Sequence, residues 1–99
     1  MTPPVYKLRV PAGVAGLIRG MHPGLKRKIK ASLKTILNDP GRGKALKNEL
    51  AGLKSFRASR FRIIYRVAGG NTIEVVAVGP RKSIYEETFR FLRGKDRKP

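Results

Sequence analysis

The run of residues from Phe61 to Val67 constrains the fold more than any other part of this chain. It reads Phe-Arg-Ile-Ile-Tyr-Arg-Val, and its β-branched and aromatic residues are typical of a strand. Turn sequences bound it on both sides, Ser59-Arg60 before it and Ala68-Gly69-Gly70-Asn71 after it. Residues 53–58 and 72–78 predict two further strands. Strands joined by turns this short pair antiparallel, so the second half of the chain predicts a meander.

Side chains on this central strand alternate between apolar and largely basic. Because successive side chains of a strand point to opposite faces, we expect an apolar face that packs against helices and a second face that is open and basic. The first face takes Phe61, Ile63, Tyr65 and Val67, and the second takes Arg62, Ile64 and Arg66.

The first half of the chain predicts a strand over residues 5–10 followed by two helices. The first helix spans residues 12–21, and Pro23 suits the first turn of a second helix that ends at residues 38–41. The short junction between them predicts an antiparallel helical hairpin, with His22 as a surface or capping residue. The apolar positions at helical spacing are Val14, Leu17, Ile18 and Met21 in the first helix, and Leu25, Ile29, Leu33, Ile36 and Leu37 in the second.

The remaining segments are short. Residues 40–53 predict a loop that Leu46, Leu50 and Leu53 fix to the core, and residues 84–92 predict a helix. Residues 94–99 form a basic segment that we expect to be a disordered tail. The order β-α-α-β-β-β-α predicts one α+β domain over residues 1–93. Its small, antiparallel-dominated sheet carries the N-terminal helical hairpin on one face and a short C-terminal helix.

The charge of the chain restricts its partners. Lysine and arginine number 23 against 6 acidic residues, a formal net charge of +17. Such a field attracts a polyanion: RNA, DNA, a ribosome or an acidic protein. The absence of cysteine excludes disulfides and thiol nucleophiles, and with one histidine we expect no metal site and no cofactor. No apolar run reaches the roughly 18–20 residues of a membrane span and no signal peptide is visible, so we expect a cytoplasmic protein with no membrane contact.

One group of cations lies on the second predicted helix, where no acid stands between Met21 and Asn38. The group fits a solvated helix face, and it fits equally a row of contacts to RNA phosphates, which position a nucleic acid without reading its sequence. Both interpretations stay open. The group consists of Lys26, Arg27, Lys28, Lys30 and Lys34.

A second group lies at the ends of the meander strands, which the turns bring together. Several guanidinium groups close to one another repel until an anion joins them, which predicts a phosphate site. A general basic surface is the alternative. The group consists of Lys54, Arg57, Arg60, Arg62, Arg66 and Arg81, with Tyr85 near them in the sequence.

Six short motifs carry a resemblance that spans residues 5–92. They are Tyr6-Lys7-Leu8, Ile36-Leu37-Asn38-Asp39-Pro40, Leu50-Ala51-Gly52-Leu53, Phe56-Arg57, the run 61–67, and Val78-Gly79-Pro80-Arg81-Lys82-Ser83-Ile84-Tyr85. With them the chain resembles the RelE/ParE toxin superfamily of bacterial toxin–antitoxin systems. The arginine-bearing strand followed by Gly-Pro-Arg and Ile-Tyr is the most specific pair. The superfamily implies the compact α+β fold predicted above.

The resemblance also implies a function. RelE-like members cleave mRNA in the ribosomal A site, whereas ParE-like members inhibit DNA gyrase and lack the basic catalytic set. Arg57, Arg62, Arg81 and Tyr85 stand at positions that match the RelE motif. This implies a metal-independent endoribonuclease that uses the 2′-OH of its substrate, acts on the ribosome and inhibits translation. Its partners would be mRNA, the ribosome and a cognate antitoxin, with which it forms a hetero-oligomer.

The chain departs from RelE on the strand before the arginine strand. Two alternating lysines of RelE fall here on Ser55 and Arg57. Lys54, a candidate base, is adjacent but points to the opposite face unless the strand is bulged. Two other functions stay open: a ParE-like inhibitor of gyrase and an RNA-binding module without catalysis. Whether Arg62 and Arg81 face a shared open pocket discriminates the gyrase inhibitor from the ribonuclease.

Overall fold

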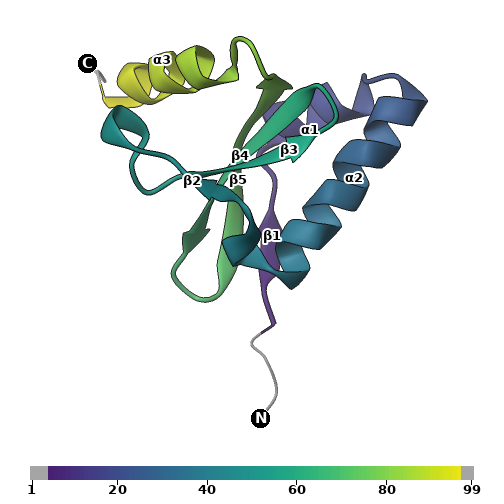
Figure 1. The fold of residues 1–99 in the computed structure, drawn as a ribbon, viewed down its shortest axis with the longest axis horizontal. Helices are drawn as coiled ribbons and strands as arrows, with labels where there is room; N and C mark the ends of the chain where they lie inside the picture. Colours follow the sequence, from purple (N-terminus) through teal and green to yellow (C-terminus); the bar gives the residue numbers. More distant parts are fainter. Residues whose placement is uncertain (1–4, 97–99) are drawn as a thin grey trace.

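The structure, a computed structural model, describes residues 5–96 (Figure 1). Its elements follow the order β1 (Lys7–Arg9), α1 (Ala12–Arg19), α2 (Pro23–Asn38), β2 (Lys44–Ala45), β3 (Lys54–Ala58), β4 (Phe61–Ala68), β5 (Thr72–Pro80) and α3 (Ile84–Asp96). Two short 3₁₀ turns, Pro40–Arg42 and Asn48–Leu50, lie between α2 and β3. The predicted α+β order is confirmed, and β2 adds a strand where the sequence predicted only a loop.

The five strands form one sheet in the order β1-β5-β4-β3-β2. The meander β3-β4-β5 is antiparallel as predicted, and β1 pairs in parallel with β5 at the edge, Leu8 opposite Ile73. The two helices between β1 and the meander provide the crossover that a parallel pair needs. In β5 an extra residue, Val76, lies between the partners of Ile64 and Tyr65, which makes a β-bulge.

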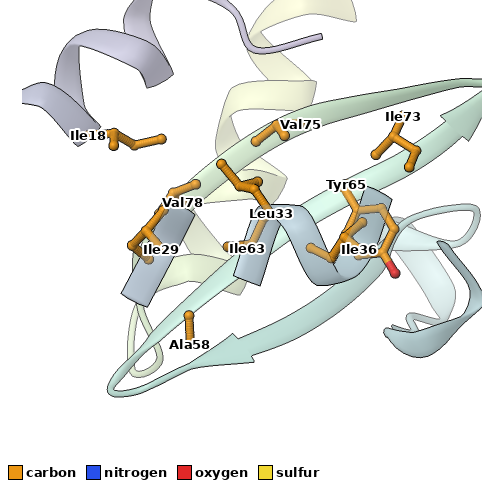
Figure 2. Packing of buried hydrophobic residues seen from close by; sticks show 10 residues of the cluster. All are labelled: Ile18, Ile29, Leu33, Ile36, Ala58, Ile63, Tyr65, Ile73, Val75 and Val78. Atoms are coloured by element: carbon orange, nitrogen blue, oxygen red, sulfur yellow. The ribbon is translucent and has the colours of Figure 1, made fainter. Parts of the chain in front are cut away.

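Helix α2 begins where the sequence predicts. Pro23 is in the first turn, and the His22 side chain caps the helix by accepting a hydrogen bond from the Gly24 amide at 3.1 Å. The predicted capping role of His22 is therefore confirmed. The helix buries its apolar stripe against the sheet, as Figure 2 shows. The core on this side consists of Ile18, Ile29, Leu33, Ile36, Ala58, Ile63, Tyr65, Ile73, Val75 and Val78.

Two residues predicted for this core are exposed. Leu17 is 51% exposed because Val14 and Ile18 already form the inward stripe of α1, and Leu17 lies to one side of it. Val67 is 44% exposed because it lies at the hairpin end of β4. The core is thus narrower than alternation predicts.

The opposite face of the sheet is not open, contrary to the prediction. Ile64 is fully buried there with Leu53 and Ile84, and Leu46, Leu50 and Leu92 pack around them. The loop leucines therefore fix their segment to the core as predicted, but to this second face. Figure 1 shows α2 and α3 on opposite sides of the sheet. Helix α3 covers part of the face that alternation alone left to solvent.

Helix α3 is longer than predicted and continues through Gly94 to Asp96. The expectation of a disordered tail from residue 94 is therefore wrong for residues 94–96, while residues 97–99 lie outside the described part of the chain. Glu86 and Arg90 form an ion pair one turn apart on this helix. Such pairs give a helix modest additional stability.

Candidate functional site

Two predicted site residues face each other across neighbouring strands. Arg57 on β3 pairs directly with Arg62 on β4, and both lie on the face that α3 partly covers. The turn between them is tight because Ser59 has a positive φ of 60°. Arg57 is exposed, and its Nε donates a hydrogen bond to the Ser59 carbonyl at 3.3 Å. The turn therefore brings two guanidinium groups to one strand end.

Arg81 joins them from the end of β5. Its backbone amide donates to the Arg60 carbonyl at 2.9 Å, which ties the end of β5 to the β3–β4 turn. The side chains enclose a hollow of about 330 Å³, here called the strand-end pocket. It is lined by Arg57, Ser59, Arg60, Pro80, Arg81 and Lys82. Four of the six are cations, and no carboxylate lines the hollow.

Arg62 lies outside this pocket, in a cluster with two hydroxyl groups. Ser55 is 1% exposed, and its Oγ lies 3.0 Å from the Tyr85 hydroxyl of α3. Nη1 of Arg62 donates to the same Ser55 Oγ at 3.4 Å, while the buried Nε of Arg62 has no hydrogen-bond partner. We call Ser55, Arg62 and Tyr85 the hydroxyl–arginine cluster. A buried donor without an acceptor is costly, so an incoming oxygen ligand would be favoured here.

Sequence reasoning did not assign a role to Ser55. Its signal was present, because Ser55 alternates with Arg57 on β3 and so shares the face of Arg62. The contact with Tyr85 spans 30 residues of sequence. Local pattern gives no information on which α3 side chain reaches the sheet.

Lys54 is not brought into either group. It pairs with Tyr65, whose ring lies in the core beneath α2, so Lys54 points to the face opposite Arg57 and Arg62. The irregularity of the sheet lies between β4 and β5, whereas β3 pairs with β4 in regular register. The bulge that would have turned Lys54 toward the arginines is absent from β3.

Arg66 is also separate from both groups. Its Nε lies 2.6 Å from Glu74 Oε1, and Arg9 lies 3.7 Å from the other oxygen of the same carboxylate. Arg66 is therefore neutralised at the far end of β4. The register explains the pairing, since Arg66 and Glu74 are direct cross-strand partners and Arg9 pairs with Glu74 from β1.

The cations of α2 lie on the other side of the sheet. Arg27, Lys28, Lys30 and Lys34 are exposed and Lys26 is half-buried. They cover the outer side of α2, because the inner side packs against the sheet. None of them lines the strand-end pocket.

The buried Tyr65 has a structural role. Its hydroxyl donates to the Pro40 carbonyl at 2.7 Å and accepts from the Gly43 amide at 3.0 Å. Burial raises the pKa of Tyr65 above its ordinary value of 10.0, with the nearby Asp39 carboxylate adding to the increase and the Gly43 hydrogen bond opposing it. The neutral phenol therefore fixes the segment after α2 to the sheet. Figure 2 shows its ring among the side chains of the core.

A second and larger hollow of about 580 Å³ lies over β5, between α1 and α3. Its lining is mainly apolar and includes Val14, Leu17, Val76 and Leu92, together with the charged residues Arg66 and Glu74. No three histidine, aspartate or glutamate side chains gather as metal ligands anywhere in the described part of the chain. No helix among the described residues is long and apolar enough to span a bilayer.

The comparison with known families decides the classification. Residues 22–85 match the sequence model of the ParE toxin of type II toxin–antitoxin systems, parDE. The chain belongs to the ParE toxin family. It is therefore a toxin of the RelE/ParE superfamily, as the motifs of the sequence indicated.

Solved structures agree with this classification of the toxin. The toxin–antitoxin complex RelBE from Mycobacterium tuberculosis is 25% identical, with 77% of this chain and 98% of that chain covered and a TM-score of 0.67. A free Escherichia coli RelE carrying two arginine-to-alanine substitutions is 19% identical, with 87% and 92% covered and a TM-score of 0.68. A YoeB–YefM complex from Staphylococcus aureus is 21% identical, with 74% and 93% covered and a TM-score of 0.61. No curated protein sequence matches the toxin.

Proposed function

We propose that this toxin is a ribosome-dependent endoribonuclease that cleaves mRNA in the A site and so inhibits translation. One observation carries the proposal: Arg57 and Arg81 line one strand-end pocket, and Arg62, the cross-strand partner of Arg57, lies in the neighbouring cluster with Ser55 and Tyr85. Several cations without a carboxylate partner suit a phosphate better than they suit one another. An mRNA in the cytoplasm offers that phosphate.

The proposed reaction needs no nucleophile from the protein. The substrate's 2′-OH attacks the neighbouring phosphorus, the bond to the 5′-oxygen breaks, and a 2′,3′-cyclic phosphate and a 5′-OH remain. Negative charge grows on the phosphoryl oxygens in the transition state, where Arg57 and Arg81 stabilise it by charge-assisted hydrogen bonds. Arg62 contributes its unpartnered Nε to the same oxygens.

Proton transfer is assigned to the Tyr85 hydroxyl and to water in this proposal. Lys54 is dropped as the base because its side chain points to the other face of the sheet. Arginine is a poor proton donor because its guanidinium group stays protonated in proteins. Much of the rate would come from the ribosome, which holds the mRNA in a reactive geometry.

We also propose that a cognate antitoxin binds this chain. The M. tuberculosis RelBE and S. aureus YoeB–YefM structures are both toxin–antitoxin complexes. A net charge of +17 favours an acidic or amphipathic partner that covers the basic surface.

A second function has an observation in its favour. The matching family model is that of ParE, and Arg62 lies outside the strand-end pocket that contains Arg81. Both facts suit a toxin that inhibits DNA gyrase through protein contacts. Cleavage is proposed first because Arg62 is only half-buried and is the direct cross-strand partner of Arg57, which lines the pocket.

Two assays performed side by side separate these functions. Primer extension on mRNA in a translating extract detects cleavage, and a supercoiling assay detects inhibition of gyrase. The ribonuclease predicts new 5′ ends and normal supercoiling. Intact mRNA with inhibited supercoiling would establish the gyrase inhibitor, and RNA binding without either effect would establish a non-catalytic module.

A further inference from the structure

The strand-end pocket contains more cations than the proposed reaction uses. Arg57 and Arg81 act on the cleaved phosphate, but Arg60 and Lys82 have no part in that step. Both side chains are exposed, and neither belongs to any ion pair found among the described residues. Four uncompensated cations around one hollow raise the energy of the free protein, so the hollow favours more than one anionic oxygen group.

The backbone keeps Arg60 and Lys82 on the same hollow. The hydrogen bond from the Arg81 amide to the Arg60 carbonyl joins the two loops that carry them. The turn of β3–β4 is set by the positive φ of Ser59, and the Ser83 amide closes the next turn by donating to the Pro80 carbonyl at 3.1 Å. Backbone hydrogen bonds therefore hold Arg60 and Lys82 close to each other, on the two loops that the Arg81–Arg60 hydrogen bond joins.

The separation between Arg60 and the hydroxyl–arginine cluster bears on which phosphates the two places can bind. Arg60 lies in the β3–β4 turn and Arg62 follows two residues later on β4, so their Cα atoms are at most about 7 Å apart. Neighbouring phosphates of one RNA strand can therefore reach both places. Arg57 lines the strand-end pocket and is also the direct cross-strand partner of Arg62, so it can contact either phosphate.

We propose that Arg60 and Lys82 form an anchoring subsite for the phosphodiester next to the one that is cleaved, within single-stranded RNA. The assignment to the neighbouring phosphate rests on the proposed ribonuclease function, whereas the presence of a phosphate site at Arg60 and Lys82 does not. The anchor acts on a group that keeps its charge throughout the reaction. It therefore lowers KM and leaves kcat unchanged.

A binding experiment tests the phosphate site directly. A short fluorescein-labelled oligouridine is titrated with the wild type, with Arg60→Glu/Lys82→Glu, and with the control Arg19→Glu/Lys47→Glu, which changes the net charge equally at two exposed cations outside the pocket and outside α2. The pocket variant should bind at least tenfold more weakly than the control. Its slope of log K against log salt should become shallower by about 0.7, since the subsite holds one phosphate and each phosphate contact on a single strand contributes about 0.7.

Equal losses in the two variants would show that only the overall field binds RNA, and this would overturn the subsite. No loss in the pocket variant would overturn it as well. Circular dichroism confirms that each variant is folded, which is expected for exposed positions.

A kinetic experiment tests the anchoring role. Cleavage of mRNA on programmed ribosomes by Arg60→Gln/Lys82→Gln should show a KM raised about tenfold with kcat unchanged. A fall in kcat with KM unchanged would overturn the anchor and make the two residues part of the catalytic set. If the wild type cleaves nothing, the ribonuclease proposal fails, and the oligouridine comparison alone decides whether the phosphate site exists.

Discussion

At the scale of single residues, the proposed site depends on a few side chains that distinguish it from the rest of the basic surface. Arg81 and Arg57 are exposed in the strand-end pocket, whereas Arg62 is half-buried and donates a hydrogen bond to Ser55. Strand alternation predicted the shared face of Arg57 and Arg62. It did not predict the contact of Ser55 with Tyr85, because that contact depends on where α3 crosses the sheet.

Arg81→Ala tests whether the loss of one of the 23 lysine and arginine side chains changes the toxicity of the protein. By analogy with the loss of one oxyanion donor, the substitution should cost about 3–4 kcal/mol of transition-state stabilisation, a hundredfold to a thousandfold in rate. Growth inhibition should therefore disappear, while folding and antitoxin binding persist. The control is Arg19→Ala, an exposed arginine at the end of α1. Folded Arg81→Ala protein that inhibits growth like the wild type would contradict the catalytic assignment.

Tyr65→Phe tests the structural role of the buried phenol. Loss of the hydroxyl leaves the Gly43 amide and the Pro40 carbonyl without a partner, which should lower the free energy of unfolding by about 1–3 kcal/mol at neutral pH. The pKa of Tyr65 is raised in the folded state, so above pH 10 the unfolded chain releases this proton first. The stability of the wild type relative to Tyr65→Phe should then be constant below pH 10 and decrease above it. Denaturant titrations across that range measure it, and a difference that does not change with pH would refute the assignment.

At the scale of elements, α3 determines the accessibility of the cluster. Its first turn packs Ile84 over Gly79 of β5, where a side chain would meet the Ile84 Cδ1 at 2.8 Å. Periodicity predicted a helix here but not its length or its position over Ile64. Helix α3 contains no clean apolar stripe. Its position is fixed by the packing of Ile84 against Leu53 and Ile64.

Gly79→Ala should displace the first turn of α3 and lengthen the contact of Tyr85 with Ser55. We expect a loss of about 1–3 kcal/mol in the free energy of unfolding, as for overpacking in a core, together with reduced toxicity. Gly69→Ala is the control, since nothing lies within 4 Å of an added Cβ there. Thermal unfolding and growth assays measure the two effects. If Gly79→Ala behaved like Gly69→Ala in both, close packing of α3 on β5 would not position Tyr85.

The outer side of α2 is predicted to contact ribosomal RNA. Lys30→Glu/Lys34→Glu should weaken association of the toxin with ribosomes and reduce its salt dependence, because fewer phosphates are neutralised. The apolar side of α2 is unaffected, so the fold should persist. Cosedimentation with ribosomes at several salt concentrations measures the effect. Unchanged cosedimentation would leave α2 with a solvated face only.

At the scale of the whole molecule, composition and pattern predicted more of the fold than of the site. Turn chemistry predicted the meander, and the α2 stripe predicted its packing, because both are local properties of the sequence. The parallel pairing of β1 with β5, the bulge at Val76 and the burial of Ile64 depend on contacts between distant segments, which periodicity does not encode. The same reason explains why Lys54 does not belong to the site. Its position in the sequence beside the site residues suggested that it did, but the regular register of β3 with β4 places its side chain on the opposite face of the sheet.

The most direct test of the central claim is primer extension on mRNA in a translating extract to which the purified toxin is added, with a parallel reaction on the same RNA without ribosomes. The proposed function predicts new 5′ ends at A-site codons with the wild type, none with Arg81→Ala, and little or no cleavage of naked RNA. Intact mRNA in the translating extract, or equal cleavage of naked and ribosome-bound RNA, would contradict a ribosome-dependent endoribonuclease.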